Sequence, residues 1–388
     1  MNILFYYGRA ILPHDGGIAS ISISLIEGLQ NAGHTISALG KLNLGKGSFL
    51  ERQYFLPSKN TLSKENIDFV SQLLEQLSID VVINQQPIDD AAEELWIRVR
   101  RQTGIRIISC MHNPVTLSAK NFALTKEFEL KEKGRRWVGR ILALPIVKYL
   151  LVKLYILRNR KRYQRIVENS DNVVVLCDGM RDELVDMIGY DDPKITIIPN
   201  FLKSIPEFQP YSEKENIVVW CGHINFTVKR LDIMLQLWKE MQTAYSDWKL
   251  YILGDGPDLN RAKQLAADLC LERLSFEGRV NPSEYYRKAK IVVTTSSYES
   301  FSLVTLEAMA NSALPIGFKT FPAASFLLGD AYDKLFVKPY QRGIIVESLK
   351  SLDNEETFKR LQTYLYQRAK DFTLGSVLNK WISLLNNK

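Results

Sequence analysis

The sequence has few of the residues that build disulfide or metal scaffolds. Its 388 residues include four cysteines and four histidines. No two of the cysteines form a Cys-x-x-Cys pair, and three of them lie in apolar runs, which indicates buried reduced thiols. The chain contains no Asp-x-Asp motif and its histidines show no ligand spacing, so we expect no metal site.

A clear membrane span and a leader peptide are also missing from the sequence. The one apolar stretch of spanning length, Trp137–Leu157, contains a proline and is interrupted by Arg140, Lys148 and Lys153. The N-terminal residues MNILFYYGRA show no basic leader and no cleavage site, so we expect no signal peptide. Together with reduced thiols, this predicts a cytoplasmic location.

The overall composition is that of an ordinary globular protein. Hydrophobic residues make up 46% and charged residues 24% of the chain, which excludes a disordered chain, a collagen and a disulfide miniprotein. The length predicts two or three domains.

Positive charge is concentrated in one segment. The chain has 50 Lys+Arg against 43 Asp+Glu, yet residues 131–165 alone hold twelve basic residues and one acid. Apolar residues interleave with these charges, which is typical of a helix lying on an anionic membrane surface. The alternative is a long helix packed on the first domain with its charges in water.

Short apolar runs alternate with segments of helical period along the whole chain. This pattern predicts a doubly wound α/β architecture with two parallel sheets. The Pro-containing and charged stretch Phe201–Glu215 marks the seam, which places one domain at 1–200 and the second at 201–370. The predicted strands are Ile3–Tyr7, Thr35–Leu39, Val81–Asn84, Ile105–Met111, Val173–Leu176, Ile195–Ile198, Ile217–Cys221, Lys249–Leu253, Leu274–Phe276, Ile291–Thr295 and Leu335–Val337.

Two stretches have the form of anion sites. Gly16-Gly17 joins the first strand to a helix, although an ordinary strand–helix turn has the same form. In Thr294–Asn311, TTSSYESFSLVTLEAMAN, a strand ends, a polar loop follows and a helix begins near Ser302. A phosphate at this helix N-terminus would have Glu299 and Glu307 on either side, in the layout of a nucleotide sugar. Spacing alone is equally compatible with two structural carboxylates.

Thr294–Asn311 also resembles the E-x7-E motif of retaining glycosyltransferases of family 4. The resemblance implies an α/β GT-B fold, in which two Rossmann-like doubly wound domains face a central cleft. Further matching segments occur in the family's order and cover nearly the whole chain. They are Gly16-Gly17, Met111-His112-Asn113, Ile198-Pro199-Asn200, Val219–Arg230, Trp248–Pro257, Phe276–Val280 and Tyr285–Lys290.

The resemblance assigns a role to each domain and to individual residues. Residues 1–200, including 131–165, would bind the acceptor, residues 201–370 the donor, and the helix of 371–388 would return to the first domain. Catalytic roles fall to His112, Glu299 and Lys229. The implied donor-binding residues are Gly16, Gly17, His223, Lys229, Arg230, Gly254, Arg279, Val280, Glu299, Phe301, Ser302, Leu303, Val304 and Glu307.

Three positions depart from the family pattern. The family usually carries an arginine where this chain has His223, and Arg230 is expected to compensate. Ser300 and Ser302 replace glycines of the motif, which restricts the backbone there.

The resemblance implies a retaining, metal-independent hexosyltransferase without a cofactor. The donor would be a nucleotide diphosphate sugar, with UDP favoured over GDP. The acceptor would be a lipid-linked or cell-surface glycan of the polysaccharide or lipopolysaccharide type. The partners would be this donor, this acceptor and an anionic membrane surface on the inner face of the cytoplasmic membrane, but not nucleic acid. A nucleotide-sugar epimerase and a non-catalytic protein that binds nucleotide sugar or nucleic acid remain alternatives.

Overall fold

The computed structural model describes residues 1–12, 16–42, 49–339 and 354–387. The chain divides into two compact units. The first comprises Met1–Asn113, Leu157–Lys203 and Leu374–Lys388, and the second comprises Pro114–Ile156 and Ser204–Thr373. Residue 388 of the predicted C-terminal segment and residues 340–353 of the predicted second domain lie outside the described residues.

The first unit is built on a parallel sheet of seven strands among its described residues, in the order β3-β2-β1-β4-β5-β6-β7. Every residue of β4 is buried, as expected for a strand covered on both faces. The chain reverses its winding direction between β1 and β4. The strands are β1 Asn2–Arg9, β2 Thr35–Leu42, β3 Gln53–Phe55, β4 Val81–Asn84, β5 Arg106–Cys110, β6 Asn172–Val175 and β7 Ile195–Ile197.

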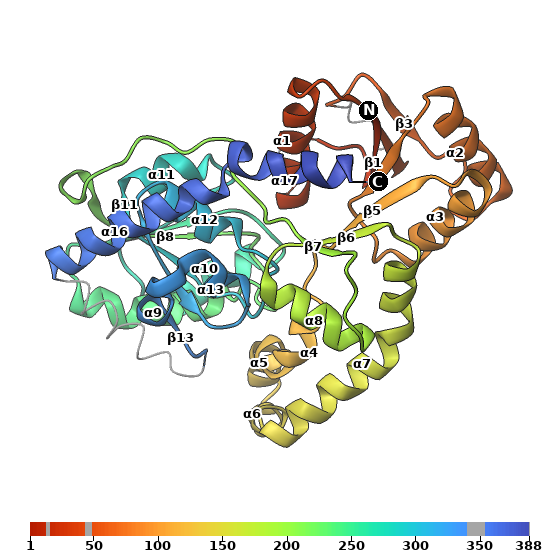
Figure 1. The fold of residues 1–388 in the computed structure, drawn as a ribbon. Helices are drawn as coiled ribbons and strands as arrows, with labels where there is room; N and C mark the ends of the chain where they lie inside the picture. The colour runs from red at the N-terminus through yellow and green to blue at the C-terminus, as the bar shows by residue number, and fades with distance from the viewer. Residues whose placement is uncertain (13–15, 43–48, 340–353, 388) are drawn as a thin grey trace. The chain divides into compact units, whose positions relative to one another are not determined.

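Helices flank this sheet (Figure 1). The C-terminal helix α17 contacts α1, and Arg106 of β5 donates to the carbonyl oxygens of Leu384 and Leu385 at 2.7 Å each. The C-terminal segment therefore belongs to the first unit. The helices are α1 Gly17–Asn31, α2 Lys64–Gln76, α3 Asp90–Thr103, α8 Asp178–Ile188, α17 Leu374–Asn386 and the second half of α7 Pro145–Glu168.

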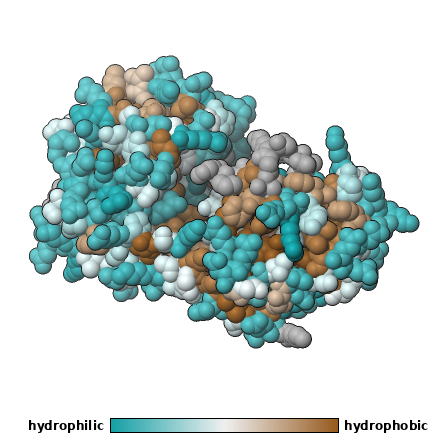
Figure 2. Space-filling view, turned by 90° about the horizontal axis from the view of Figure 1, so that it is seen from above, coloured by the Kyte–Doolittle hydropathy of each residue, from teal (hydrophilic) through white to brown (hydrophobic). Residues whose placement is uncertain are grey.

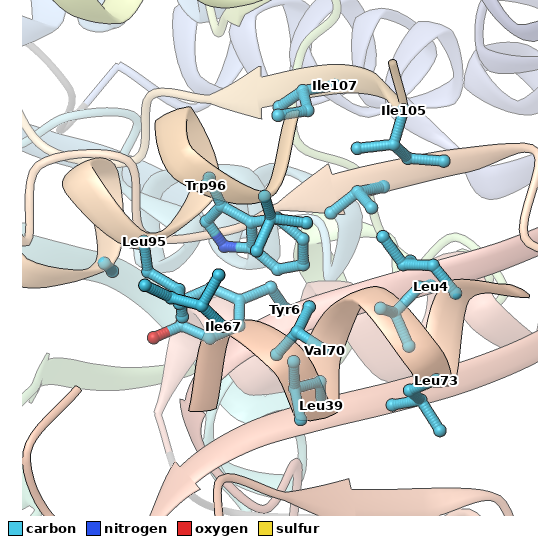
Figure 3. Close-up of a cluster of buried hydrophobic side chains, with 14 of the residues drawn as sticks. Leu4, Tyr6, Leu39, Ile67, Val70, Leu73, Leu95, Trp96, Ile105 and Ile107 are labelled. Atoms are coloured by element: carbon cyan, nitrogen blue, oxygen red, sulfur yellow. The ribbon is translucent and has the colours of Figure 1, made fainter. Parts of the chain in front are cut away.

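A hydrophobic cluster joins α2 and α3 to the first sheet (Figure 3). Trp96 of α3 is 2% exposed and meets the ring of Tyr6 from β1 edge to face, with the ring centroids 5.4 Å apart. Ile67 and Val70 of α2 belong to the same cluster. This packing holds the two helices on one face of the sheet, because all the side chains involved leave water together.

The second unit is built on a parallel sheet of six strands among its described residues, in the order β10-β9-β8-β11-β12-β13. Here the winding reverses between β8 and β11, which are hydrogen-bonded neighbours. The strands are β8 Glu215–Cys221, β9 Lys249–Leu253, β10 Leu274–Gly278, β11 Ala289–Thr294, β12 Leu314–Phe318 and β13 Phe336–Val337.

The predicted strands are all present: β4 and β9 have the predicted bounds, and the others differ by up to three residues at an end. Two further strands were missed. The short strand β3 pairs only with β2, at the edge of the first sheet. Strand β12 is buried throughout and pairs with β11, yet it contains Pro315 and Gly317. These two residue types usually mark turns, and here burial between neighbouring strands overrides that preference.

Several helices of the second unit come from residues 114–156, which the sequence analysis assigned to the first domain. Residues 114–156 group with the second unit, so the basic segment is divided between the two units. The stretch Trp137–Leu157, expected to be part of one helix, belongs to two helices, and Pro145 is the first residue of the second. The α-helices of this unit are α4 Leu117–Lys120, α5 Phe122–Glu132, α6 Arg136–Leu142, α9 Leu231–Ala244, α10 Leu259–Asp268, α11 Pro282–Lys288, α12 Leu303–Ala310, α13 Ala323–Leu328, α14 Tyr332–Leu335 and α16 Glu355–Ala369, together with the first half of α7.

The surface is mainly hydrophilic on the face seen in Figure 2, with hydrophobic patches between the polar side chains. Within the described ranges, no helix combines the length and the apolar character that crossing a bilayer requires.

We predict that Trp96→Ala lowers the free energy of unfolding of the first unit by about 3–5 kcal/mol, because it leaves a cavity beside Tyr6. Urea unfolding followed by circular dichroism measures the change. Trp137→Ala is the matched control, since that side chain is 63% exposed and its loss should cost less than about 0.5 kcal/mol. Equal effects of the two variants would contradict the packing described for Trp96.

Candidate functional site

The candidate site of the second unit lies at the carboxyl ends of β8 and β11. These strands are neighbours, and the winding direction of the sheet changes between them. Loops that leave the carboxyl ends of parallel strands diverge at such a point and open a crevice for ligands. The loop after β8 carries Lys229, and the loop after β11 carries Glu299.

Hydrogen bonds hold these two loops together. The amide of Ser297 donates to the carbonyl oxygen of Val228 at 2.7 Å, and the hydroxyl of Thr295 donates to the carbonyl oxygen of Lys229 at 2.9 Å. The indole of Trp220, at the end of β8, donates to the same Thr295 hydroxyl at 2.9 Å. The backbone that presents Lys229 is therefore fixed by the loop that presents Glu299.

An ion pair joins the two loops at their side chains. The Lys229 ammonium lies 2.5 Å from Oε1 of Glu299, and the Ser296 hydroxyl donates to the same oxygen at 2.6 Å. The two ionised side chains are 26% and 14% exposed, so both remain accessible to a ligand. A cation and a carboxylate are thus presented together at the crevice.

Helix α12 begins next to this ion pair. Its N-cap residue, Ser302, has a φ of 65°, which is the left-handed conformation that glycine adopts most readily. The Ser302 hydroxyl accepts from the amide of Thr305. The amides of Leu303 and Val304 belong to the first turn, which has no preceding helical carbonyl to accept from them, so they can serve an anion.

Glu307 lies one turn into α12 and has an unusual acidity. Burial raises the pKa of its carboxyl to about 7, and the nearby Lys229 ammonium offsets part of that rise. Hydrogen-bond donors that reach this carboxyl would stabilise its charged form, and sugar hydroxyls are such donors. Along the chain, Glu299 precedes the N-terminus of α12 and Glu307 follows it.

Gly254 allows the loops after β8 and β9 to approach one another closely. Its φ is 130°, and a Cβ at this position would lie 2.0 Å from the carbonyl oxygen of Gly222. The amide of Gly254 donates to the carbonyl oxygen of Gly278 at 2.7 Å. No other residue type fits this position without moving the backbone.

Two predicted donor-binding side chains are engaged elsewhere. The Arg230 guanidinium is 1% exposed and bonds to both carboxylate oxygens of Asp232, to Glu127 and to the carbonyl oxygen of Leu124. Its side chain is committed to this buried network, and the role of Arg230 at the diphosphate stays a prediction. Phe301 is 1% exposed and packs on Phe372, so it supports the loop and does not present its ring to a ligand.

Three other predicted residues have exposed side chains in loops of the second unit. His223 follows β8, and Arg279 and Val280 follow β10. They stay predictions, since these side chains make no contact that identifies a ligand.

The predicted residues of the first unit also lie at carboxyl ends of strands. Gly16 has a φ of 98° and is the N-cap residue of α1, which starts at Gly17. His112 follows β5, and its Nε2 contacts the amide oxygen of Gln85, which follows β4. Burial lowers the pKa of His112 to about 4, so its imidazole is neutral at physiological pH.

Sequence reasoning missed Gln85, Thr295 and Ser296. Gln85 and Thr295 directly follow β4 and β11, which border the reversals of their sheets, and Ser296 is the next residue after Thr295. That position is the signal that could have identified them. The described residues hold no group of three or more His, Cys, Asp or Glu side chains arranged to bind a metal ion.

Two family models match successive parts of the chain. The Glycosyltransferase Family 4 model matches residues 15–203, and the model Glycosyl transferases group 1 matches residues 203–372. Together they account for nearly all of both units.

Curated relatives match about half of the chain. The amylovoran biosynthesis glycosyltransferase AmsD of Erwinia amylovora is 31% identical over 55% of this chain and 64% of its own length. The GalNAc-alpha-(1->4)-GalNAc-alpha-(1->3)-diNAcBac-PP-undecaprenol alpha-1,4-N-acetyl-D-galactosaminyltransferase of Campylobacter jejuni is 27% identical over 50% of this chain and 54% of its own length. The chain thus spans less than two-thirds of these relatives.

The fold recurs in solved structures. The pneumococcal O-GlcNAc transferase GtfA, in complex with UDP and GlcNAc, superposes with a TM-score of 0.70 at 12% identity, over 99% of this chain and 98% of that one. At this identity the likeness establishes the GT-B fold. Because the two family models follow one another without a gap over residues 15–372, the chain belongs to the GT-B glycosyltransferases, with a family 4 region followed by a group 1 region.

Proposed function

We propose that the chain is a retaining hexosyltransferase that moves a sugar from a nucleotide diphosphate sugar to a lipid-linked or cell-surface glycan. The observation that carries this proposal is that Lys229 pairs with Glu299 and lies near Glu307, beside the first turn of α12. These groups supply a cation and free amides for two phosphates, and two carboxylates for hydroxyl groups.

Lys229 and the amides of Ser302, Leu303 and Val304 would bind the donor diphosphate. Glu307 would accept from the ribose hydroxyls and Glu299 from hydroxyls of the transferred sugar. The negative charge that develops on the leaving diphosphate would be met by groups already fixed in place, without a metal ion. The UDP in the GtfA structure supports a preference for UDP over GDP.

Retention requires the new bond on the face from which the old one leaves. The bond between the anomeric carbon and the diphosphate oxygen would break as the acceptor oxygen bonds to that carbon. The acceptor proton would pass to the departing diphosphate oxygen. His112 is proposed to assist as a neutral hydrogen-bonding group, since burial keeps the pKa of its imidazole low. The α-linkage in the name of the Campylobacter relative is consistent with retention from an α-linked donor.

The acceptor is proposed to reach the enzyme at an anionic membrane on its cytoplasmic side. Of the eleven large hydrophobic side chains that are exposed in the described residues, eight lie in 137–157, among the basic residues of 131–165. The Campylobacter relative is named for an acceptor carried on undecaprenol, which supports a lipid-linked acceptor.

The decisive assay offers the purified chain a panel of UDP- and GDP-sugars with and without lipid-linked acceptors. Transfer that needs an acceptor, with the product anomer read by NMR, separates a retaining transferase from an epimerase, which would act on the donor alone. Absence of binding to every nucleotide sugar would refute the proposal.

We predict that Lys229→Ala weakens UDP binding about tenfold to a hundredfold, because a charge-assisted bond to phosphate is lost. Isothermal titration calorimetry measures the affinity. Lys239→Ala is the matched control, as this lysine is exposed on α9. Unchanged affinity in the Lys229 variant would remove this residue from the site.

We predict a pH dependence of stability that originates at Glu307. Its pKa is about 7 in the folded protein against an ordinary value of 4.5, so the folded state binds more protons between these pH values. The free energy of unfolding should therefore fall as the pH rises through this window, by up to about 3 kcal/mol. Glu307→Gln should remove this component in urea titrations at several pH values, whereas the exposed control Glu240→Gln should keep it. Parallel pH curves for both variants would contradict the assignment.

A further inference from the structure

A pocket of about 390 Å³ lies within the second unit between α5, α6 and α9. It is separate from the crevice at Lys229, since neither Lys229 nor the loop after β11 contributes to its wall. Its wall combines charged residues with small and apolar ones. The lining residues that matter here are Glu127 and Lys131 of α5, Arg136, Gly139 and Arg140 of α6, and Asp232 of α9.

The two acidic groups of this pocket share one buried cation. Glu127 and Asp232 both pair with the Arg230 guanidinium, at 3.0 and 2.9 Å. In the described residues, by contrast, no ion pair involves Lys131, Arg136 or Arg140. Arg230 compensates one of the two carboxylates, so the wall holds four cations against two carboxylates and keeps an excess of positive charge.

Helix α6 places these cations beside an apolar surface. Arg136, Gly139, Arg140 and Ala143 recur at helical spacing along the side that lines the pocket. Trp137 and Ile141 are each one residue further along and are 63% and 45% exposed.

The apolar surface continues into the first half of α7. Ile146, Tyr149, Leu150 and Leu154 are each more than half exposed there. A ligand with a phosphate in the pocket would thus have apolar side chains immediately outside it.

We propose that this pocket binds the phosphate headgroup of a membrane amphiphile, whose hydrocarbon chain lies along the exposed side chains of α6 and α7. Arginine guanidinium groups form bidentate hydrogen bonds to phosphate oxygens. Burial of exposed apolar side chains against a hydrocarbon chain removes them from water and so favours binding. The inference rests on the membrane contact proposed above and gives that contact a specific site. It requires nothing of the transfer reaction.

The test measures binding to phosphatidylcholine vesicles with and without phosphatidic acid, by flotation at fixed ionic strength. Gly139→Phe keeps every charge but fills the pocket, because this glycine lines it and a Cβ there already lies 3.7 Å from Leu130. Arg136→Gln/Arg140→Gln removes two pocket cations. The matched control, Arg158→Gln/Lys161→Gln, removes two exposed cations of α7 that lie outside the pocket.

We expect Gly139→Phe and the pocket double variant to lose at least about tenfold more affinity for phosphatidic acid vesicles than the control double variant loses. Equal losses in the two double variants, with no effect of Gly139→Phe, would show diffuse charge attraction only and would overturn the proposal.

A second arm distinguishes a lipid from a soluble phosphate. With UDP saturating the proposed donor site, dioctanoyl phosphatidic acid below its micelle concentration should bind the wild-type protein more tightly than inorganic phosphate does. Equal affinity would make the hydrocarbon chain irrelevant and would refute a lipid site. UDP affinity of each variant is measured in parallel and should not change, so failure of this pocket is distinguishable from failure of the proposed donor site.

Discussion

The ion pair between Lys229 and Glu299 depends on the point where the second sheet reverses its winding. Strands β8 and β11 are adjacent, so the loops that follow them leave the same edge of the sheet and can bond to each other. Trp220, Thr295 and Ser297 fasten these loops together through buried hydrogen bonds. The proximity of Lys229 and Glu299 follows from this one topological constraint.

The buried network around Arg230 extends that constraint to the segment after β5. By bonding to Leu124 and Glu127, Arg230 attaches α5 to the start of α9. An isolated buried guanidinium would be strongly unfavourable, but here two carboxylates and a carbonyl oxygen satisfy it. The same network offsets one of the two carboxylates of the neighbouring pocket, whose wall keeps an excess of positive charge.

Much of the fold was predictable because parallel strands buried on both faces are short, β-branched and apolar. Strand β12 was not predictable in this way, since Pro315 and Gly317 mark turns unless neighbouring strands enclose them. The E-x7-E stretch, with its strand, loop and helix, was also predictable. The commitment of Arg230 was not, because its partner Leu124 lies 106 residues away in the sequence and nothing near Arg230 indicates it. The grouping of residues 114–156 with the second unit likewise depends on contacts that are distant in the sequence.

At Gly254 the structure depends on a residue that has no side chain. The carbonyl of Gly222 occupies the volume that any side chain at residue 254 would need. Gly254 carries no functional group, yet even a methyl group there would push apart the ends of β8 and β9, and the loop after β8 carries Lys229. Tolerance to substitution at residue 254 is consequently a measure of how rigid the crevice must be.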